Sequence, residues 1–179
     1  MILKKRQQEQ GSLMAEFKQV ISEEDIAEVA RLAREIWQEH YIPIIGREQV
    51  NYMLEKFQSR GAITRQIAQK HEYYLVLDRA QSAGYVGLVP DPGESKLLLS
   101  KIYIRKELRG RGLGKETLEF VEELCRQRGI RTIRLTVNKN NACSISWYTK
   151  RGFTNTGPTV QDIGEGFVMD DFIMEKTIF

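Results

Sequence analysis

Residues 109–115 read RGRGLGK, a stretch that sets three glycines among three cations. A glycine inside a regular element costs roughly 0.5–1 kcal/mol relative to alanine, so three together indicate a compensating use. The stretch follows an apolar segment, KLLLSKIYI (96–104), which has the composition of a central strand. It precedes apolar residues at helical spacing that end at Gly129, a residue typical of helix ends. We therefore place residues 109–115 between a central strand and the start of a helix.

This placement favours an anion-binding loop. The first amides of a helix have no internal partner, and the helix dipole leaves partial positive charge there. Glycines let a phosphate approach those amides, and the cations add full charge. The alternative is a glycine-rich turn whose cations are simply solvated. The predicted loop comprises Arg109, Gly110, Arg111, Gly112, Leu113, Gly114 and Lys115.

Two common phosphate-binding patterns do not fit this loop. The P-loop pattern fails because Arg109 stands where its first glycine should be and Glu116 follows Lys115. The dinucleotide pattern G-x-G-x-x-G fails because Lys115 takes its last glycine position. The pattern that fits is R-x-x-G-x-G, which runs from Arg109 to Gly114.

The rest of the chain alternates strand and helix patterns, with no internal repeat and no linker that would separate domains. We expect one α/β domain over residues 13–179, preceded by a polar arm at residues 1–12. The stretch YIPIIG (41–46) should break the first helix, because it contains a proline and a glycine. Strands are expected at 14–21, 72–78, 84–89, 96–104, 132–137 and 167–179, with a looser strand before the last one. Helices are expected at 22–40, on both sides of 59–61, at 113–128 and at 142–151.

Composition excludes several classes of protein. The 179 residues are 41% hydrophobic and 28% charged, which is typical of a soluble globular chain, and no apolar run is long enough for a membrane helix. The net charge of +3 is too small to argue for nucleic acid. Two cysteines, Cys125 and Cys143, imply no disulfide framework, so we expect a reducing, cytoplasmic location. We expect both cysteines to be small buried hydrophobic residues. The two isolated histidines form no metal site with them, and no metal is expected.

A second motif accompanies the loop. The segment NACSISWYTKRGF (141–153) sets an asparagine before a helix, a tyrosine near its end and a glycine-phenylalanine pair after it. Together with R-x-x-G-x-G, it resembles the GCN5-related N-acetyltransferase (GNAT) family. The resemblance implies a mixed, mostly antiparallel sheet of six to seven strands flanked by helices and splayed between the fourth and fifth strands. It also implies acetyl transfer from acetyl-coenzyme A to a primary amine, by direct attack in a ternary complex.

The resemblance assigns roles to individual residues. Residues 109–115 would hold the pyrophosphate of the coenzyme. Backbone groups of Ile102 and Ile104, with Tyr103 between them, would face the pantetheine arm and the acetyl carbonyl. Asn141 and Ser144 would line the same wall. Tyr148 would protonate the departing thiolate.

The acceptor side is predicted from weaker signals. Four acids, Asp162, Glu165, Asp170 and Asp171, fall within ten residues, and in a strand Asp170 and Asp171 point to opposite faces. Trp37, His40 and Tyr41 lie in a segment that should cover the acceptor. The stretches YIPIIG, LSKIYI and IGEGFVMDDF also resemble bacterial acetyltransferases of the spermidine/spermine type. A small polyamine is therefore the expected acceptor, with Glu35, Glu39 and His40 as candidate bases.

Other classes of function stay open at this point. A coenzyme-A-binding module without catalysis would keep the loop and need neither Tyr148 nor an acceptor. A nucleic-acid binder could use Arg105, Lys106, Arg109 and Arg111, but this patch lacks interleaved aromatic residues. The acceptor could also be a peptide α-amine or an amino metabolite. We expect a monomer or a homodimer that binds no nucleic acid and no membrane.

Overall fold

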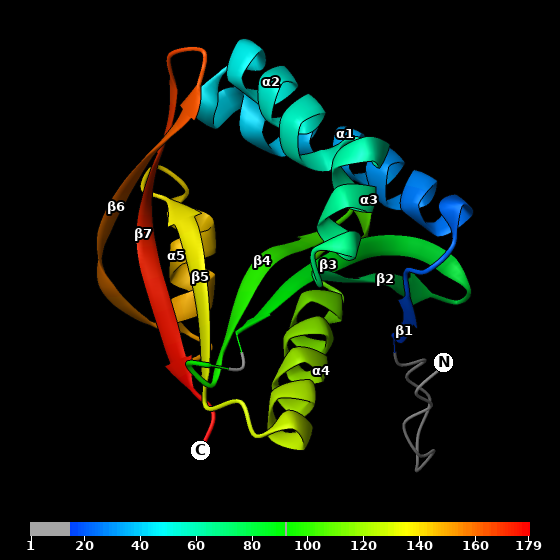
Figure 1. Ribbon diagram of the computed structural model, residues 1–179, viewed down its shortest axis with the longest axis vertical. Coiled ribbons are helices and arrows are strands. Elements are labelled where there is room, and N and C mark those ends of the chain that lie inside the picture. Colours follow the sequence, from blue (N-terminus) through cyan, green and yellow to red (C-terminus); the bar gives the residue numbers. More distant parts are fainter. Residues whose placement is uncertain (1–14, 92) are drawn as a thin grey trace. The chain divides into compact units, whose positions relative to one another are not determined.

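The computed structural model describes residues 15–91 and 93–179, so the arm expected at residues 1–12 lies outside the described residues (Figure 1). The strands are β1 (Glu16–Gln19), β2 (Glu72–Asp78), β3 (Gln81–Asp91), β4 (Lys96–Ile104), β5 (Thr132–Asn138), β6 (Thr154–Gly164) and β7 (Phe167–Thr177). The helices are α1 (Glu23–Ile45), α2 (Arg47–Gln58), α3 (Arg60–Ala68), the 3₁₀ turn η1 (Lys106–Leu108), α4 (Leu113–Arg128) and α5 (Ala142–Thr149).

The seven strands are hydrogen-bonded in the order β1-β2-β3-β4-β5-β7-β6. The β4–β5 pair is parallel, whereas β1–β2, β2–β3, β5–β7 and β6–β7 are antiparallel. The segment KLLLSKIYI occupies a central position in this order, as its composition indicates. The expected fold class, a mixed and mostly antiparallel sheet flanked by helices, is confirmed.

The pairing of β4 with β5 is short. It joins residues 96–98 to residues 132–134 and does not extend to the later residues of either strand. A parallel pair that stops this early leaves the backbone of the following residues without that partner strand. The expected splay between the fourth and fifth strands is therefore present.

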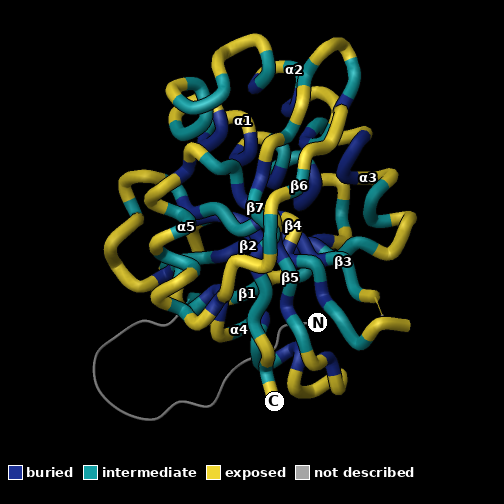
Figure 2. Tube along the Cα trace, turned by 90° about the vertical axis from the view of Figure 1, so that its left-hand side faces the viewer, coloured by how far each residue is buried: buried dark blue, intermediate teal, exposed yellow. Residues whose placement is uncertain are grey.

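The chain divides into two compact units. The first contains the described residues up to Val89 together with Lys101–Val121, and the second contains Pro90–Ser100 and Glu122–Phe179. In the first unit, β2 and β3 are largely buried, as Figure 2 shows in dark blue. The helices α1 and α4 cover them from opposite faces, because Tyr103 contacts Trp37 of α1 whereas the next residue, Ile104, packs with Leu113 of α4.

The first helix does not stop where the sequence suggests. α1 runs for 23 residues through Tyr41 and Pro43 to Ile45, so the predicted end of this helix at about residue 40 is wrong, and only the glycine of the stretch 41–46 ends it. Pro43 has no N–H to donate to the Glu39 carbonyl, but only Ile44 and Ile45 follow it in the helix, so a distortion there disturbs little of α1. The helix ends instead at Gly46, whose φ of +83° suits glycine and whose N–H donates to the Ile42 carbonyl at 3.0 Å.

The two cysteines differ in the second unit. Cys125 of α4 is buried, and burial raises the pKa of its thiol to about 11. Cys143 is exposed in the first turn of α5, so the expectation of two buried cysteines is wrong for this residue. The pattern of α5 carries no strong apolar stripe that would have indicated which face is covered.

Lys101 of β4 is an unusual member of the core of the first unit. It is only 7% exposed, donates from Nζ to Gln66 Oε1 at 3.3 Å and lies over the Tyr73 ring. Its aliphatic stem packs against Gly87, where a β-carbon would lie 3.2 Å from Lys101 Cδ. Burial lowers the pKa of its ammonium group to about 8, because the charged form loses its hydration.

This burial predicts a pH-dependent stability. At neutral pH the folded protein carries a poorly solvated ammonium, so Lys101→Met should stabilise it by about 1–3 kcal/mol. Below about pH 8 the Lys101 side chain is protonated in both the folded and the unfolded state, so the folded state carries the full cost of burying the charge. Between about pH 8 and pH 10.5 only the unfolded state keeps the proton, so the parent protein gains stability and the advantage of the variant shrinks. Urea unfolding of the parent and of Lys101→Met at several pH values measures the difference in their free energies of unfolding. A difference that stays constant from pH 7 to about pH 10.5 would contradict the prediction.

Candidate active site

The loop between η1 and α4 has the backbone of an anion site. Gly110 and Gly112 adopt φ of +78° and +92° on either side of Arg111, which is the kind of backbone in which successive N–H groups can bind one anion. The amides of residues 110–112 have no partner among the described residues, and the first helical bond runs from Glu116 N to Gly112 O. A β-carbon on Gly110 would meet no atom within 4 Å. The loop is therefore open, with its donors uncommitted, and fits a pyrophosphate.

The three cations of this loop are used differently. Arg109 donates from Nε to the Ile104 carbonyl at 2.9 Å, so it braces the end of β4. Lys115 lies 3.7 Å from Glu119 in an exposed pair, which is weak because water screens it. Arg111 is exposed and has no partner within residues 15–91 and 93–179. Arg111 is thus the cation most available to a phosphate.

The end of β4 leads into this loop through a tight crossing. A β-carbon on Gly84 of β3 would lie 2.1 Å from the Tyr103 carbonyl oxygen, so only glycine permits this approach. Arg105 N donates to the Ala83 carbonyl at 2.9 Å on the same side. Ile102 is half-buried and Ile104 is buried. The three predicted residues 102–104 therefore occupy a firmly held strand end.

Aromatic residues from α1 and β4 gather beside this strand end. Trp37 lies 4.6 Å from Tyr41 and 5.7 Å from Tyr103 between ring centroids, and the Tyr41 and Tyr103 hydroxyls are 3.3 Å apart. Trp37 Nε1 is fully enclosed without a hydrogen-bond partner. The His40 ring meets the Tyr41 ring edge-on at 4.8 Å. The structure thus brings all three predicted acceptor-side residues of α1 together with Tyr103.

The three candidate bases have different surroundings. Glu35 binds Arg31 at 2.9 Å and Arg105 at 2.8 Å, and Glu39 binds Lys106 at 3.1 Å. These carboxylates link α1 to the segment that precedes the loop. The pKa of His40 is lowered by burial and by the positive charge of Arg109, so its imidazole is neutral at physiological pH. A neutral imidazole has a ring nitrogen that can accept a proton.

In the second unit, the motif 141–153 forms α5 and the turn after it. Asn141 is 3% exposed and caps the helix, because its side-chain oxygen accepts from Ser144 N at 3.3 Å. Ser144 is half-buried. Tyr148 is held edge-on to Trp147 and Phe153, at 5.2 and 5.5 Å between centroids. Its carbonyl accepts from the Arg151 and Phe153 amides, so the glycine-phenylalanine turn fixes the end of this helix.

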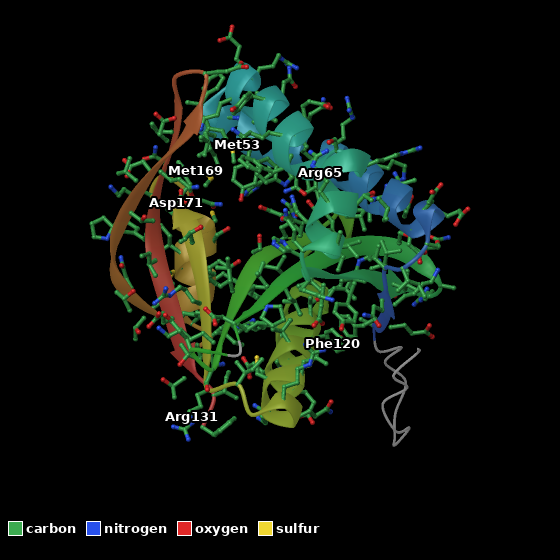
Figure 3. All side chains as sticks on the ribbon, in the orientation of Figure 1. Met53, Arg65, Phe120, Arg131, Met169 and Asp171 are labelled. Atoms are coloured by element: carbon green, nitrogen blue, oxygen red, sulfur yellow. The ribbon has the colours of Figure 1, made fainter. Side chains whose placement is uncertain are left out.

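The four acids do not form one cluster. Asp162 and Glu165 lie at the β6–β7 turn, where Asp162 Oδ1 accepts from Gly164 N at 2.7 Å. Asp170 is exposed and forms an ion pair with Lys139. Asp171, labelled on β7 in Figure 3, is only 7% exposed. Burial and the neighbouring Asp170 raise the pKa of Asp171, against a hydrogen bond from Thr136 and the charge of Lys139. Asp170 and Asp171 do occupy opposite environments, as strand alternation predicts.

Several functional contacts were not anticipated from the sequence. The link between Glu35 and Arg105 joins residues seventy positions apart, which no local pattern reveals. The buried Lys101 had a visible signal, because it interrupts an otherwise apolar face of β4. Tyr85, fully buried and 5.4 Å from Tyr103 between centroids, extends the aromatic group into β3.

Comparison with known proteins identifies the family of this chain, and the matched region contains the residues described above. The model of the acetyltransferase (GNAT) family matches residues 30–153, which include both motifs. The chain belongs to the GNAT family. It is 28% identical to an uncharacterised N-acetyltransferase of Lactobacillus delbrueckii subsp. lactis, over 88% of this chain and 95% of that one. It is 27% identical to the spermidine N(1)-acetyltransferase of Thermoplasma acidophilum, over 87% and 93%.

A solved structure agrees with this assignment. The PaiA N-acetyltransferase of Thermoplasma acidophilum, in complex with coenzyme A, superposes with a TM-score of 0.75 and 25% identity, covering 92% of this chain and 99% of that one. Together these likenesses show that the present chain is an acetyl-CoA-dependent N-acetyltransferase. The alternative of a module that only binds the coenzyme is therefore set aside. None of the helices in the described part of the chain is long and apolar enough to cross a membrane.

The open loop predicts a sharp effect of substitution at Gly112. Gly112→Asp would place a strained residue and a carboxylate beside the pyrophosphate, and acetyl-coenzyme A binding should fall at least about 100-fold. Gly129→Asp is the matched control, because Gly129 has a φ of +68° at the other end of α4 and no atom within 4 Å of a β-carbon. It should share the backbone strain and keep the affinity. Calorimetric titration of both folded variants with acetyl-coenzyme A measures the two affinities. An equal loss of affinity in Gly112→Asp and Gly129→Asp would contradict the prediction.

Proposed function

We propose that this enzyme acetylates a small polyamine of the spermidine type, by direct attack of a primary amine on acetyl-coenzyme A in a ternary complex. The observation that carries the proposal is the likeness to a spermidine N(1)-acetyltransferase over nearly the whole of both chains. Asp171 adds chemical support, because a sequestered carboxylate is a natural partner for an alkylammonium group.

The acceptor must first lose a proton. An alkylammonium has an ordinary pKa of about 10.4, so it is a poor nucleophile near neutral pH. His40 is the proposed base, because burial and Arg109 keep its imidazole neutral. Its contact with Tyr41, whose hydroxyl meets that of Tyr103, connects it to the end of β4. Glu35 and Glu39 are assigned to holding the segment 105–106 through their ion pairs.

The acetyl donor is held by the main chain. The amides of residues 110–115 and the cation of Arg111 are proposed to bind the pyrophosphate, while Arg109 keeps the loop attached to Ile104. Bound acetyl-coenzyme A supplies the thioester. Backbone dipoles of Ile102 and Ile104 are proposed to orient the pantetheine arm and to stabilise negative charge on the carbonyl oxygen. Asn141, once its capping bond to Ser144 has fixed its orientation, is proposed to bind the same arm.

The leaving thiolate needs a proton, and Tyr148 is the proposed donor. An ordinary phenol has a pKa near 10 and an ordinary thiol about 8.5, so the transfer is uphill by about 2 kcal/mol. This is small compared with the barrier of a reaction that turns over at about 10 per second. The contacts with Trp147 and Phe153 hold the ring, so the hydroxyl has a fixed direction.

Removal of the Tyr148 hydroxyl should therefore affect chemistry and not binding. Tyr148→Phe should lower kcat roughly 100-fold, with acetyl-coenzyme A affinity nearly unchanged, since both ring contacts remain. Tyr74→Phe is a matched control, because it removes a hydroxyl that donates to Glu72 at 2.9 Å in the first unit. Steady-state kinetics and calorimetry separate the two effects. A Tyr148→Phe enzyme with the parent kcat would exclude Tyr148 from the mechanism.

Acceptor preference is the second test. Spermidine should exceed a monoamine of similar length in kcat/KM, and the advantage should shrink with rising ionic strength, because salt screens attraction beyond about 10 Å at 0.1 M. Asp171→Asn should reduce that advantage about tenfold and leave acetyl-coenzyme A binding intact. Asp170→Asn should act less, because Lys139 already neutralises Asp170. Faster, salt-independent turnover of a peptide α-amine or an amino metabolite would refute the polyamine acceptor and leave the acetyltransferase assignment standing.

A further inference from the structure

A groove of about 400 Å³ lies within the first unit and is lined by residues of the helices α1, α2 and α3. These three helices follow one another along the chain and are labelled in Figure 1. This volume is at the lower end of the range for small-molecule sites. Two small residues one helical turn apart, Ala27 and Ala30, leave the space open along α1. The groove is lined by Ala27, Ala30, Arg31, Arg34, Leu54, Gln58, Ser59 and Arg60. None of these residues belongs to the loop 109–115 or to the aromatic group beside β4.

The lining is positively charged. Three of its eight residues are arginines and none is acidic. Arg31 is committed to Glu28 and Glu35, at 2.8 and 2.9 Å. Arg34 and Arg60 are exposed, and neither has a side-chain partner within the part of the chain that the structure describes. Two uncommitted guanidinium groups thus flank one small groove.

The start of α3 adds donors to the same place. Ser59 caps this nine-residue helix, with its hydroxyl accepting from Ala62 N at 3.3 Å and its carbonyl from Ile63 N at 2.9 Å. The amides of Arg60 and Gly61 are left without a partner in the described structure. The first turn of α3 contains no acidic residue, so the positive end of the helix dipole is not neutralised.

Gln58 is a further polar residue of the groove lining. It is only 3% exposed, and its Oε1 accepts from the Tyr85 hydroxyl at 3.3 Å. This bond directs the other half of the amide, Nε2, away from Tyr85. Nε2 has no partner among the described residues, yet it is not one of the fully enclosed unsatisfied atoms, which are Trp37 Nε1 and Arg151 Nε. Gln58 is one of the residues that line the groove, so its N–H₂ group is a candidate donor to a molecule bound there.

We propose that this groove binds a small phosphate-bearing anion. A phosphate group presents three acceptor oxygens, and the groove offers convergent donors from Arg34, Arg60, the α3 amides and Gln58. The Gln58 Nε2 group, which has no partner among the described residues, would donate a hydrogen bond to an anion at this position. The site is separate from acetyl transfer and does not depend on the identity of the acceptor amine.

The experiment uses the full protein saturated with coenzyme A, so that the loop 109–115 is occupied. Calorimetric titration with glycerol 3-phosphate at low salt should show one saturable site, with acetate binding at least about tenfold more weakly. Arg34→Gln and Arg60→Gln should each weaken glycerol 3-phosphate about fivefold or more. Arg131→Gln is the matched control, an exposed arginine of the second unit labelled in Figure 3, and should leave the affinity unchanged.

The outcomes are decisive in both directions. Saturable binding that is lost in the two groove variants and kept in the control supports the site. Absence of saturable binding, equal losses in all three variants, or equal affinity for acetate would overturn it. Circular dichroism confirms that each variant is folded, which these exposed substitutions should permit. Because the readout is binding and not acetyl transfer, failure here is distinguishable from failure of the polyamine proposal.

Discussion

At Gly84 the backbone of β3 approaches the Tyr103 carbonyl of β4 so closely that any side chain would collide with it. Because of this contact, β4 ends where Arg105 N bonds Ala83 O, and Ile104 packs with Val76, Ala83 and Leu113. The following segment is then tied down twice, through Arg109 to the Ile104 carbonyl and through Arg105 to Glu35. The open glycine loop is therefore held on its N-terminal side by these two bonds, and on its other side it continues directly into α4. Preorganisation of this kind leaves the main-chain donors ready for a ligand without an ordering cost at binding.

The parts of the fold that local chemistry determines could be predicted from the sequence. The strands β2 and β4 match their predicted bounds, because each is a run of apolar residues between turn-forming segments. The start of α4 was predictable from the glycines that precede Leu113, whereas the role of the loop in binding pyrophosphate stays a prediction. The two short helices predicted on either side of residues 59–61 are also present as α2 and α3, since Ser59 is a good N-cap for α3.

The parts that tertiary contacts determine could not be predicted in this way. Pro43 suggests a helix break when only the sequence is considered, but it lies two residues before the end of α1, and Gly46 ends the helix. Arg109 fits a phosphate-binding pattern, yet its guanidinium is used by the Ile104 carbonyl. Asp170 and Asp171 are adjacent acids in different surroundings, because Asp170 is exposed and pairs with Lys139 whereas Asp171 is buried. Ion-pair partners far apart in sequence leave no periodic signal.

The contrast between the two thiols has a practical consequence. Cys125 is enclosed, and its raised pKa keeps it protonated, whereas Cys143 stands in solvent in the first turn of α5. A maleimide dye at neutral pH would therefore attach at a single native position, two residues after Asn141, without any engineered substitution. Fluorescence from that dye would give the second unit of this acetyltransferase its own spectroscopic signal.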